Sequence, residues 1–191
     1  ESVKNKSSKI ERVGVIGGGQ LAWMMAGAAK KLGIELVVQT PNDRDPAVAI
    51  ASETILAPID DAKGTATLAS RCDAITFENE FVNLEALSLL ARQGVCFRPS
   101  LSVLAQILDK YDQRCYLQHL GLPVPKFVAI EEFSIHNSEF TIHSPLVLKA
   151  RRHGYDGQGT FIIKDLDALE QKLASAKHSE HQPLFLLEEF V

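Results

Sequence analysis

Residues 149–160 read KARRHGYDGQGT, and this stretch decides the fold of the second half of the chain. The apolar run at 146–150 predicts a strand that leads into a glycine-rich turn, and residues 160–163 predict a second strand that leaves it. A Walker-type phosphate loop does not fit, because that loop is followed by a helix after its Gly-Lys-Ser/Thr. The pattern favours a hairpin-like flap whose backbone amides and Lys149 can face phosphate oxygens. An ordinary β-hairpin with a glycine-rich turn is the alternative.

Strands and helices alternate on both sides of the flap. Up to residue 99, strands are expected at 12–17, 34–39, 53–57, 73–77 and 95–97, and helices at 20–32, 60–70 and 84–92. Beyond it, helices are expected at 101–108, 110–120 and 166–176, and strands at 127–130, 146–150, 160–163 and 184–191. The fold class is therefore α/β. We expect a disordered tail at 1–9, a Rossmann-like parallel-sheet domain at 10–99 with right-handed crossovers, and a second domain at 100–191.

A glycine motif follows the first expected strand. Residues Gly17–Ala22 match G-x-G-x-x-G/A, whose glycines allow a tight turn with amides facing a phosphate. A dinucleotide would also require an acidic residue at the end of the second strand. That strand ends in Gln39 and Thr40, and Asp43 and Asp45 follow in a loop that we expect to lie too far on. A phosphate-bearing small molecule fits better, and a tight turn without a ligand is the alternative.

Acidic residues follow the fourth expected strand. Glu78, Asn79 and Glu80 stand at its carboxyl end, which in an open parallel sheet lines the ligand crevice. Carboxylates there can hold sugar hydroxyls or an amine. The same edge should carry Gln20, so we favour a binding role over a solvated acidic turn.

The composition excludes several classes of protein. The chain has 191 residues, a net charge of −4 and 46% hydrophobic residues, as ordinary globular proteins do. Its one basic cluster is short and suits a small anion, not nucleic acid. No apolar run reaches the roughly 18 residues of a membrane span. The three cysteines form neither a disulfide framework nor a zinc motif, which fits a reducing cytoplasm.

Four segments, in this order, resemble the ATP-grasp superfamily and, within it, the 5-(carboxyamino)imidazole ribonucleotide synthase family. They are GGGQL at 17–21, TFENE at 76–80, DKYDQ at 109–113 with LPVP at 122–125, and the flap at 149–160. The resemblance covers essentially residues 10–191. It implies a pre-ATP-grasp domain followed by an incomplete ATP-grasp domain.

The resemblance also implies an activity. In this family ATP and bicarbonate form carboxyphosphate, whose carbon is captured by the amine of aminoimidazole ribonucleotide, a carbon–nitrogen ligation of purine biosynthesis. It implies a cytoplasmic homodimer with no nucleic-acid or membrane partner. Magnesium ligands are expected beyond residue 191, so the 191-residue chain by itself should not turn over. Another ATP-grasp ligase, such as the formate-dependent glycinamide ribonucleotide transformylase, and a non-catalytic nucleotide-binding module are the alternatives.

Roles carry over position by position. The ATP-binding positions are Lys110, Lys149, Gly154, Tyr155, Asp156, Gly157, Gln158, Gly159 and Thr160, with Glu188, Glu189, Phe190 and Val191 at the adenine. Tyr155, Asp156 and Gln158 are the catalytic candidates, and Gln20, Leu21 and Glu78 would bind the ribonucleotide. No residue of the chain is assigned to metal. Gln158 departs from the usual Lys or Arg, and Thr160 from the usual Gln.

Overall fold

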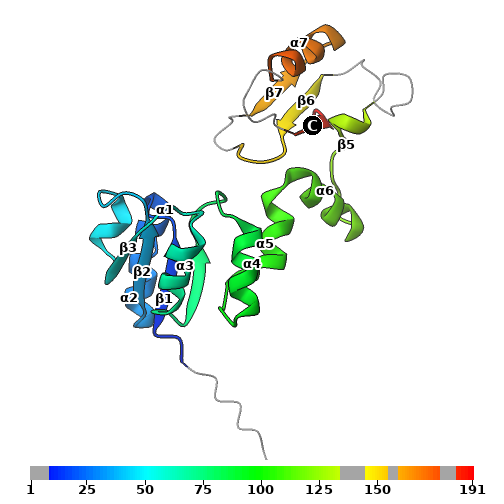
Figure 1. The fold of residues 1–191 in the computed structure, drawn as a ribbon. Helices are drawn as coiled ribbons and strands as arrows, with labels where there is room; N and C mark the ends of the chain where they lie inside the picture. Colours follow the sequence, from blue (N-terminus) through cyan, green and yellow to red (C-terminus); the bar gives the residue numbers. More distant parts are fainter. Residues whose placement is uncertain (1–8, 134–144, 155–158, 177–183) are drawn as a thin grey trace, which may run out of the picture. The chain divides into compact units, whose positions relative to one another are not determined.

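The computed structural model describes residues 9–133, 145–154, 159–176 and 184–191 and divides the chain into two units. The units are Glu1–Leu104 and Ala105–Val191, and each has a sheet of its own (Figure 1). Among the described residues, no helix is both long and apolar enough to cross a membrane.

The first unit is built on a four-stranded sheet in the order β3-β2-β1-β4. Its strands are β1 (Arg12–Ile16), β2 (Glu35–Thr40), β3 (Glu53–Leu56) and β4 (Ala74–Phe77). Every neighbouring pair is parallel, as the alternation of strands and helices predicts. Ile16 stands opposite Gln39 on one side and Phe77 on the other, so the carboxyl ends of β1, β2 and β4 meet at one edge.

The strand predicted at 95–97 is reduced to a single bridge. Phe97 pairs in parallel with Ile75, and two backbone bonds hold it there: Ile75 N to Cys96 O at 2.8 Å and Arg98 N to Ile75 O at 2.8 Å. Gly94 precedes this segment and Pro99 follows it. The run between them is too short to form a longer ladder.

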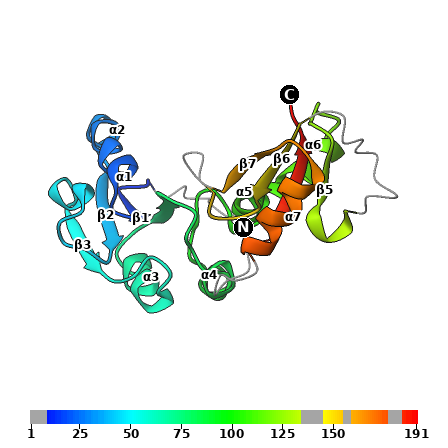
Figure 2. The same cartoon turned by 90° about the horizontal axis from the view of Figure 1, so that it is seen from above.

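Helices cover both faces of this sheet (Figure 2). They are α1 (Gln20–Met24), α2 (Ala26–Leu32) and the 3-10 turn η1 (Pro46–Ala49) on one face, and α3 (Ala62–Ala69) and α4 (Leu84–Arg92) on the other. Successive strand residues point to opposite faces. Val15 therefore packs with Ala22 of α1, and Ile16 packs with Leu68 of α3.

The single helix predicted at 20–32 is wrong in one respect. Met25 separates α1 from α2, although its backbone stays in the right-handed helical region. Its N–H bonds the carbonyl of Ala22, three residues back, at 3.1 Å. The regular pattern resumes when Ala29 N bonds Met25 O at 2.9 Å. Both segments are helical, as the composition predicts, but the tightening at Met25 leaves no signature in the residue pattern.

The second unit contains a four-stranded antiparallel sheet in the order β5-β8-β6-β7. Helix α5 (Leu101–Leu108) contains the boundary between the two units. The elements that follow it are α6 (Lys110–His119), β5 (Phe127–Ala129), η2 (Ile130–Glu132), β6 (Leu146–Ala150), β7 (Thr160–Ile163), α7 (Leu166–Ala176) and β8 (Phe185–Glu189). Strands β6 and β7 form the predicted hairpin, with Lys149 opposite Thr160.

The two faces of this sheet differ in character. Leu148 of β6 and Leu187 of β8 pack with Leu169 of α7 on one face. Because side chains alternate along a strand, Lys149 and Glu188 lie on the opposite face. Figure 1 shows α7 and α6 on opposite sides of this sheet, so the ionisable side chains face α6.

Candidate functional site

A buried carboxylate organises two cations on the α6 side of the second sheet. The Glu188 side chain is 2% exposed and accepts hydrogen bonds from Lys149 Nζ and Arg114 Nε, each at 2.5 Å. Burial by itself raises the pKa of Glu188, but the hydrogen bonds and charges of Arg114 and Lys149 outweigh it and hold that pKa below its usual range. Glu188 is therefore ionised at neutral pH, and this group of three side chains carries one surplus positive charge.

A second buried carboxylate, Asp109, lies at the start of α6. Its Oδ1 accepts the backbone N–H of Tyr111 at 2.9 Å, which caps the helix. The same carboxylate accepts Arg151 Nε at 2.9 Å and Arg152 Nε at 3.3 Å. Arg151 also stacks on the Tyr111 ring, with its guanidinium carbon 4.8 Å from the ring centroid. Asp109 thus joins the beginning of α6 to the end of β6.

Lys110 completes the cluster. Its backbone N–H donates to Arg151 O at 2.9 Å, and its Nζ donates to Gly154 O at 3.1 Å. Four cationic side chains are paired with the three carboxylates Asp109, Asp112 and Glu188, and Lys110, bound to the Gly154 carbonyl, is the fifth cation. The surplus of two positive charges lies beside the root of the β6–β7 hairpin. An anion with several negative charges would complement it.

The described part of the glycine-rich turn is closely packed. Gly159 has a φ of +74°, and its carbonyl accepts Ala150 N at 2.7 Å. A Cβ at this position would lie 2.9 Å from Ala150 Cβ, so only glycine fits without strain. Thr160 begins β7 and is exposed. The predicted site residues Tyr155, Asp156, Gly157 and Gln158 lie outside the described residues.

The segment predicted to hold adenine closes the described chain. The Glu188 carboxylate is already bound by Lys149 and Arg114. Glu189 is tied to Lys126 twice, through a backbone bond and through its Oε1, both at 2.9 Å. Phe190 and Val191 are exposed. Backbone and exposed apolar surface at 190–191, and not the Glu188 carboxylate, are therefore available to a ligand.

The first glycine motif receives a carboxylate from the neighbouring strand. Glu78 N donates to Ile16 O at 2.8 Å, and a Cβ built on Gly19 would lie 2.6 Å from Glu78 Oε1. Gly17 has a φ of +112° and would bring a Cβ within 2.5 Å of Glu78 Oε2. The glycines therefore make room for the Glu78 carboxylate at the carboxyl edge of the sheet. Gln20 and Leu21, at the start of α1, are exposed at this turn.

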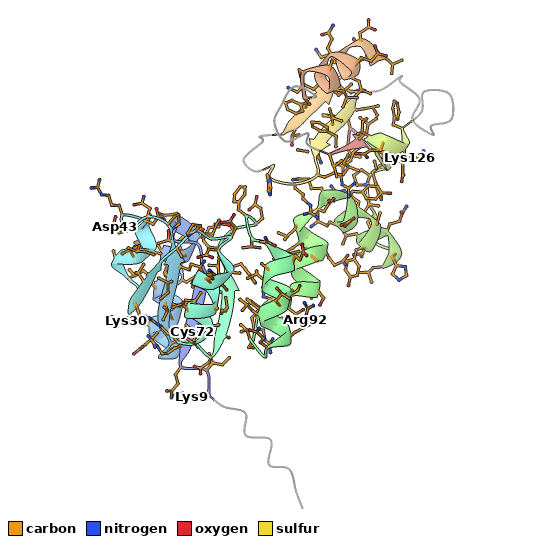
Figure 3. All side chains as sticks on the ribbon, viewed as in Figure 1. Lys9, Lys30, Asp43, Cys72, Arg92 and Lys126 are labelled. Atoms are coloured by element: carbon orange, nitrogen blue, oxygen red, sulfur yellow. The ribbon has the colours of Figure 1, made fainter. Side chains whose placement is uncertain are left out.

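Figure 3 marks this edge by Asp43, in the loop after β2, while Lys9, Lys30, Cys72 and Arg92 mark the opposite end of the unit. The expectation that Asp45 lies too far from the tip of β2 is wrong. Its carboxylate accepts a hydrogen bond from the Thr40 hydroxyl. The reason is η1, which turns the loop back so that Ala47 N bonds Gly18 O at 2.9 Å.

Sequence reasoning missed Arg114 altogether and quoted Asp109 only as part of a motif. Arg114 meets Glu188 across 74 positions of sequence, and no local pattern announces such a pair. Asp109 had a usable signal, because an aspartate directly before a predicted helix favours an N-cap. In the described part of the chain, no group of three or more His, Cys, Asp or Glu side chains is placed to hold a metal ion.

Family models and known proteins are similar to this chain over most of its length. Residues 10–107 match the ribonucleotide synthetase preATP-grasp domain, and residues 115–191 match the ATP-grasp domain. The N5-carboxyaminoimidazole ribonucleotide synthase of Synechococcus elongatus is 56% identical over 185 residues, which are 96% of this chain and 46% of that protein. The chain thus spans less than half the length of this relative.

Solved structures of related synthases have the same fold as this chain. The Staphylococcus aureus N5-carboxyaminoimidazole synthetase, complexed with ADP, is 30% identical, with a TM-score of 0.83 over 95% of this chain and 48% of that one. The Aspergillus clavatus synthase, in complex with ADP and 5-aminoimidazole ribonucleotide, is 27% identical, with a TM-score of 0.79 over 95% of this chain and 46% of that one. The chain belongs to the N5-carboxyaminoimidazole ribonucleotide synthase family, with a preATP-grasp domain followed by ATP-grasp sequence.

Proposed function

We propose that this chain supplies nucleotide- and ribonucleotide-binding parts of an ATP-dependent carbon–nitrogen ligase of purine biosynthesis. The reaction is the carboxylation of 5-aminoimidazole ribonucleotide with bicarbonate. The observation that carries the proposal is the cationic cluster at the root of the β6–β7 hairpin, where Lys149 is held by the buried Glu188 carboxylate and Lys110 by the Gly154 carbonyl. The Aspergillus clavatus relative, whose structure holds ADP and 5-aminoimidazole ribonucleotide, supports the choice of ligands.

In this proposal the second unit receives ATP. Lys110 and Lys149 contact its phosphates, and the flap from Gly154 to Thr160 lies over them. The residues fit a polyphosphate because the cluster keeps a surplus of two positive charges after its own ion pairs are counted. Adenine is held by the segment from Glu188 to Val191, through its backbone and the exposed Phe190.

The ribonucleotide binds at the carboxyl edge of the first sheet. Gln20 and Leu21 stand exposed at the turn after β1, and Glu78 fills the adjacent end of β4. The Glu78 carboxylate can accept hydrogen bonds from ribose hydroxyls or from an amine. Open parallel sheets bind ligands at this edge, which supports the assignment.

ATP supplies a phosphoryl group that activates bicarbonate for attack by the amine nitrogen. The terminal phosphoryl passes to a bicarbonate oxygen and ADP leaves. The nitrogen lone pair then attacks the activated carbon, and inorganic phosphate leaves. Magnesium would neutralise charge on the transferring group. The described residues offer it no cluster of ligands, so we assign no magnesium ligand among them.

Calorimetry on the full-length gene product tests the two binding sites separately. ATP and ADP should bind much more tightly than AMP, because only they reach the lysines with a terminal phosphate. 5-Aminoimidazole ribonucleotide should bind with or without nucleotide present. Equal affinity for AMP and ATP would refute the phosphate assignment, and absence of ribonucleotide binding would refute the assignment of the first sheet edge.

A further inference from the structure

Asp109 makes more contacts than a helix cap requires. An N-cap needs one oxygen to accept an amide of the first helical turn, and Oδ1 does this for Tyr111. The side chain is nevertheless 2% exposed, with Arg151 and Arg152 bound to its two oxygens. Asp61 caps α3 in the first unit through the equivalent amides, Lys63 N at 3.0 Å and Gly64 N at 3.2 Å, and among the described residues no arginine is bound to it.

The contacts of Asp109 converge on the backbone that carries the lysines. Arg151 O accepts Lys110 N at 2.9 Å, so the residue that Asp109 holds by its side chain also holds Lys110 by its backbone. Lys110 Nζ in turn reaches Gly154 O at 3.1 Å. Lys149, on β6, stands two residues before Arg151, which follows the end of that strand at Ala150. The Asp109 carboxylate therefore fixes the position of the start of α6 relative to the residues that follow β6.

Electrostatics explains why the carboxylate is buried at this point. Arg151, Arg152 and Lys110 stand close together and repel one another. A neutral cap would leave much of that repulsion uncompensated, because the other carboxylate paired with Arg151, Asp112, is exposed and lies farther away, at 3.6 Å. The ionised Asp109 offsets it, and the arginine hydrogen bonds keep its pKa low in spite of burial.

We propose that Asp109 is a positioning residue for the nucleotide site, which holds Arg151, Arg152 and Lys110 in the arrangement that receives the phosphates of ATP without touching the nucleotide itself. This inference rests on the proposed function. It concerns a residue that acts through its neighbours, so its removal should affect phosphate recognition and spare the rest of the ligand.

Asp109→Asn removes the negative charge of the side chain but keeps its ability to cap α6. Asparagine is as good an N-cap as aspartate, so α6 should still begin at Lys110. Its amide group, however, presents hydrogen-bond donors where the arginines also present donors. Asp109→Ser is the second variant, because serine keeps the cap without that conflict and guards against a folding defect. Asp61→Asn is the matched control in the first unit.

Calorimetry on the full-length gene product should show ATP affinity reduced about tenfold in both Asp109 variants, the loss expected when one charge-assisted contact to a phosphate is misaligned. AMP affinity should stay within about twofold, a difference below half a kilocalorie. The amide of Lys110 should exchange faster with deuterium, while the capped amide of Tyr111 stays protected in Asp109→Asn. Asp61→Asn should change none of these.

Two results would overturn the inference alone: wild-type ATP-to-AMP selectivity in both Asp109 variants, or an equal loss of ATP and AMP affinity. The second would show a merely structural role. Failure of the wild-type protein to bind ATP would instead remove the proposed function and this inference together. The wild-type titration therefore distinguishes the two failures.

Discussion

Lys149 has two roles, an ion pair within the second sheet and the proposed contact with ATP. Its ammonium is paired with Glu188 on the α6 face of the second sheet, yet 25% of its side chain is exposed. Glu188 shares its charge with Arg114, so the lysine is only partly neutralised. A partly neutralised, partly exposed ammonium can be held in place by the protein and still attract a phosphate oxygen.

Lys149→Ala should therefore weaken ATP binding by the full-length gene product. One hydrogen bond to a charged group is worth about 1.5–3 kcal/mol, which corresponds to a loss of about tenfold to a hundredfold in affinity. Calorimetric titration with ATP measures it. Lys164→Ala is the control, because Lys164 is an exposed lysine that follows β7 in the same hairpin. Unchanged ATP affinity in Lys149→Ala would contradict the assignment.

Glu188→Gln should make the protein less stable and less sensitive to acid. The folded-state pKa of Glu188 lies below the unfolded value of about 4.3, so the unfolded state binds the extra proton between these two pKa values. The carboxylate therefore stabilises the fold fully above that window, and the contribution is lost as the pH falls through the folded pKa. Urea unfolding of wild type and variant, repeated from pH 7 down to the acid limit, should show a flatter pH dependence for Glu188→Gln.

The expected loss at neutral pH is about 3 kcal/mol, the lower end for a broken buried pair, because Arg114 and Lys149 keep some exposure. Glu53→Gln is the matched control. Glu53 also bridges two arginines, Arg12 and Arg71, but its side chain is 32% exposed. That variant should lose at most about 1 kcal/mol. Equal losses in the two variants would show that burial of Glu188 has no special effect.

At the scale of elements, the packing of α3 on β1 depends on Gly14. A Cβ at Gly14 would lie 2.8 Å from Leu68 Cγ, and Leu68 is fully buried. Gly14→Ala should therefore destabilise the fold by about 1–3 kcal/mol through overpacking. Gly27→Ala, in α2 with open space around it, should stabilise by up to about 1 kcal/mol. Urea midpoints measure both, and a shift in the same direction would contradict the packing account.

Element boundaries followed the sequence most closely where a periodic apolar run was bounded by glycine, proline or charged residues. Residues 146–150, 160–163 and 166–176 form the strand, strand and helix that were expected. The exceptions arose from local hydrogen bonding. Met25 bonds three residues back within a helical run, and Phe97 makes one bridge where a strand was expected. Neither the hydrogen bond of Met25 nor the single bridge of Phe97 alters the pattern of apolar residues, so that pattern could not predict them.

At the scale of the whole molecule, the sequence indicated which segments carry the site, but not how they pair. Glu78 beside the Gly17–Gly19 turn followed from the rule that carboxyl ends of parallel strands share an edge. The contacts of Glu188 with Arg114 and of Asp109 with Arg151 join residues 74 and 42 positions apart, and only the folded chain brings them together. Long-range ion pairs have no local signature, which is why the cationic cluster emerged from the structure.

The central claim, ATP-dependent carboxylation of a ribonucleotide, is tested most directly by ADP release from the full-length gene product. Bicarbonate and 5-aminoimidazole ribonucleotide are omitted in turn, and formate with glycinamide ribonucleotide replaces them in a parallel reaction. The account predicts sustained ADP release only when ATP, bicarbonate and 5-aminoimidazole ribonucleotide are all present. ADP release indifferent to that ribonucleotide, or sustained by formate and glycinamide ribonucleotide, would contradict it.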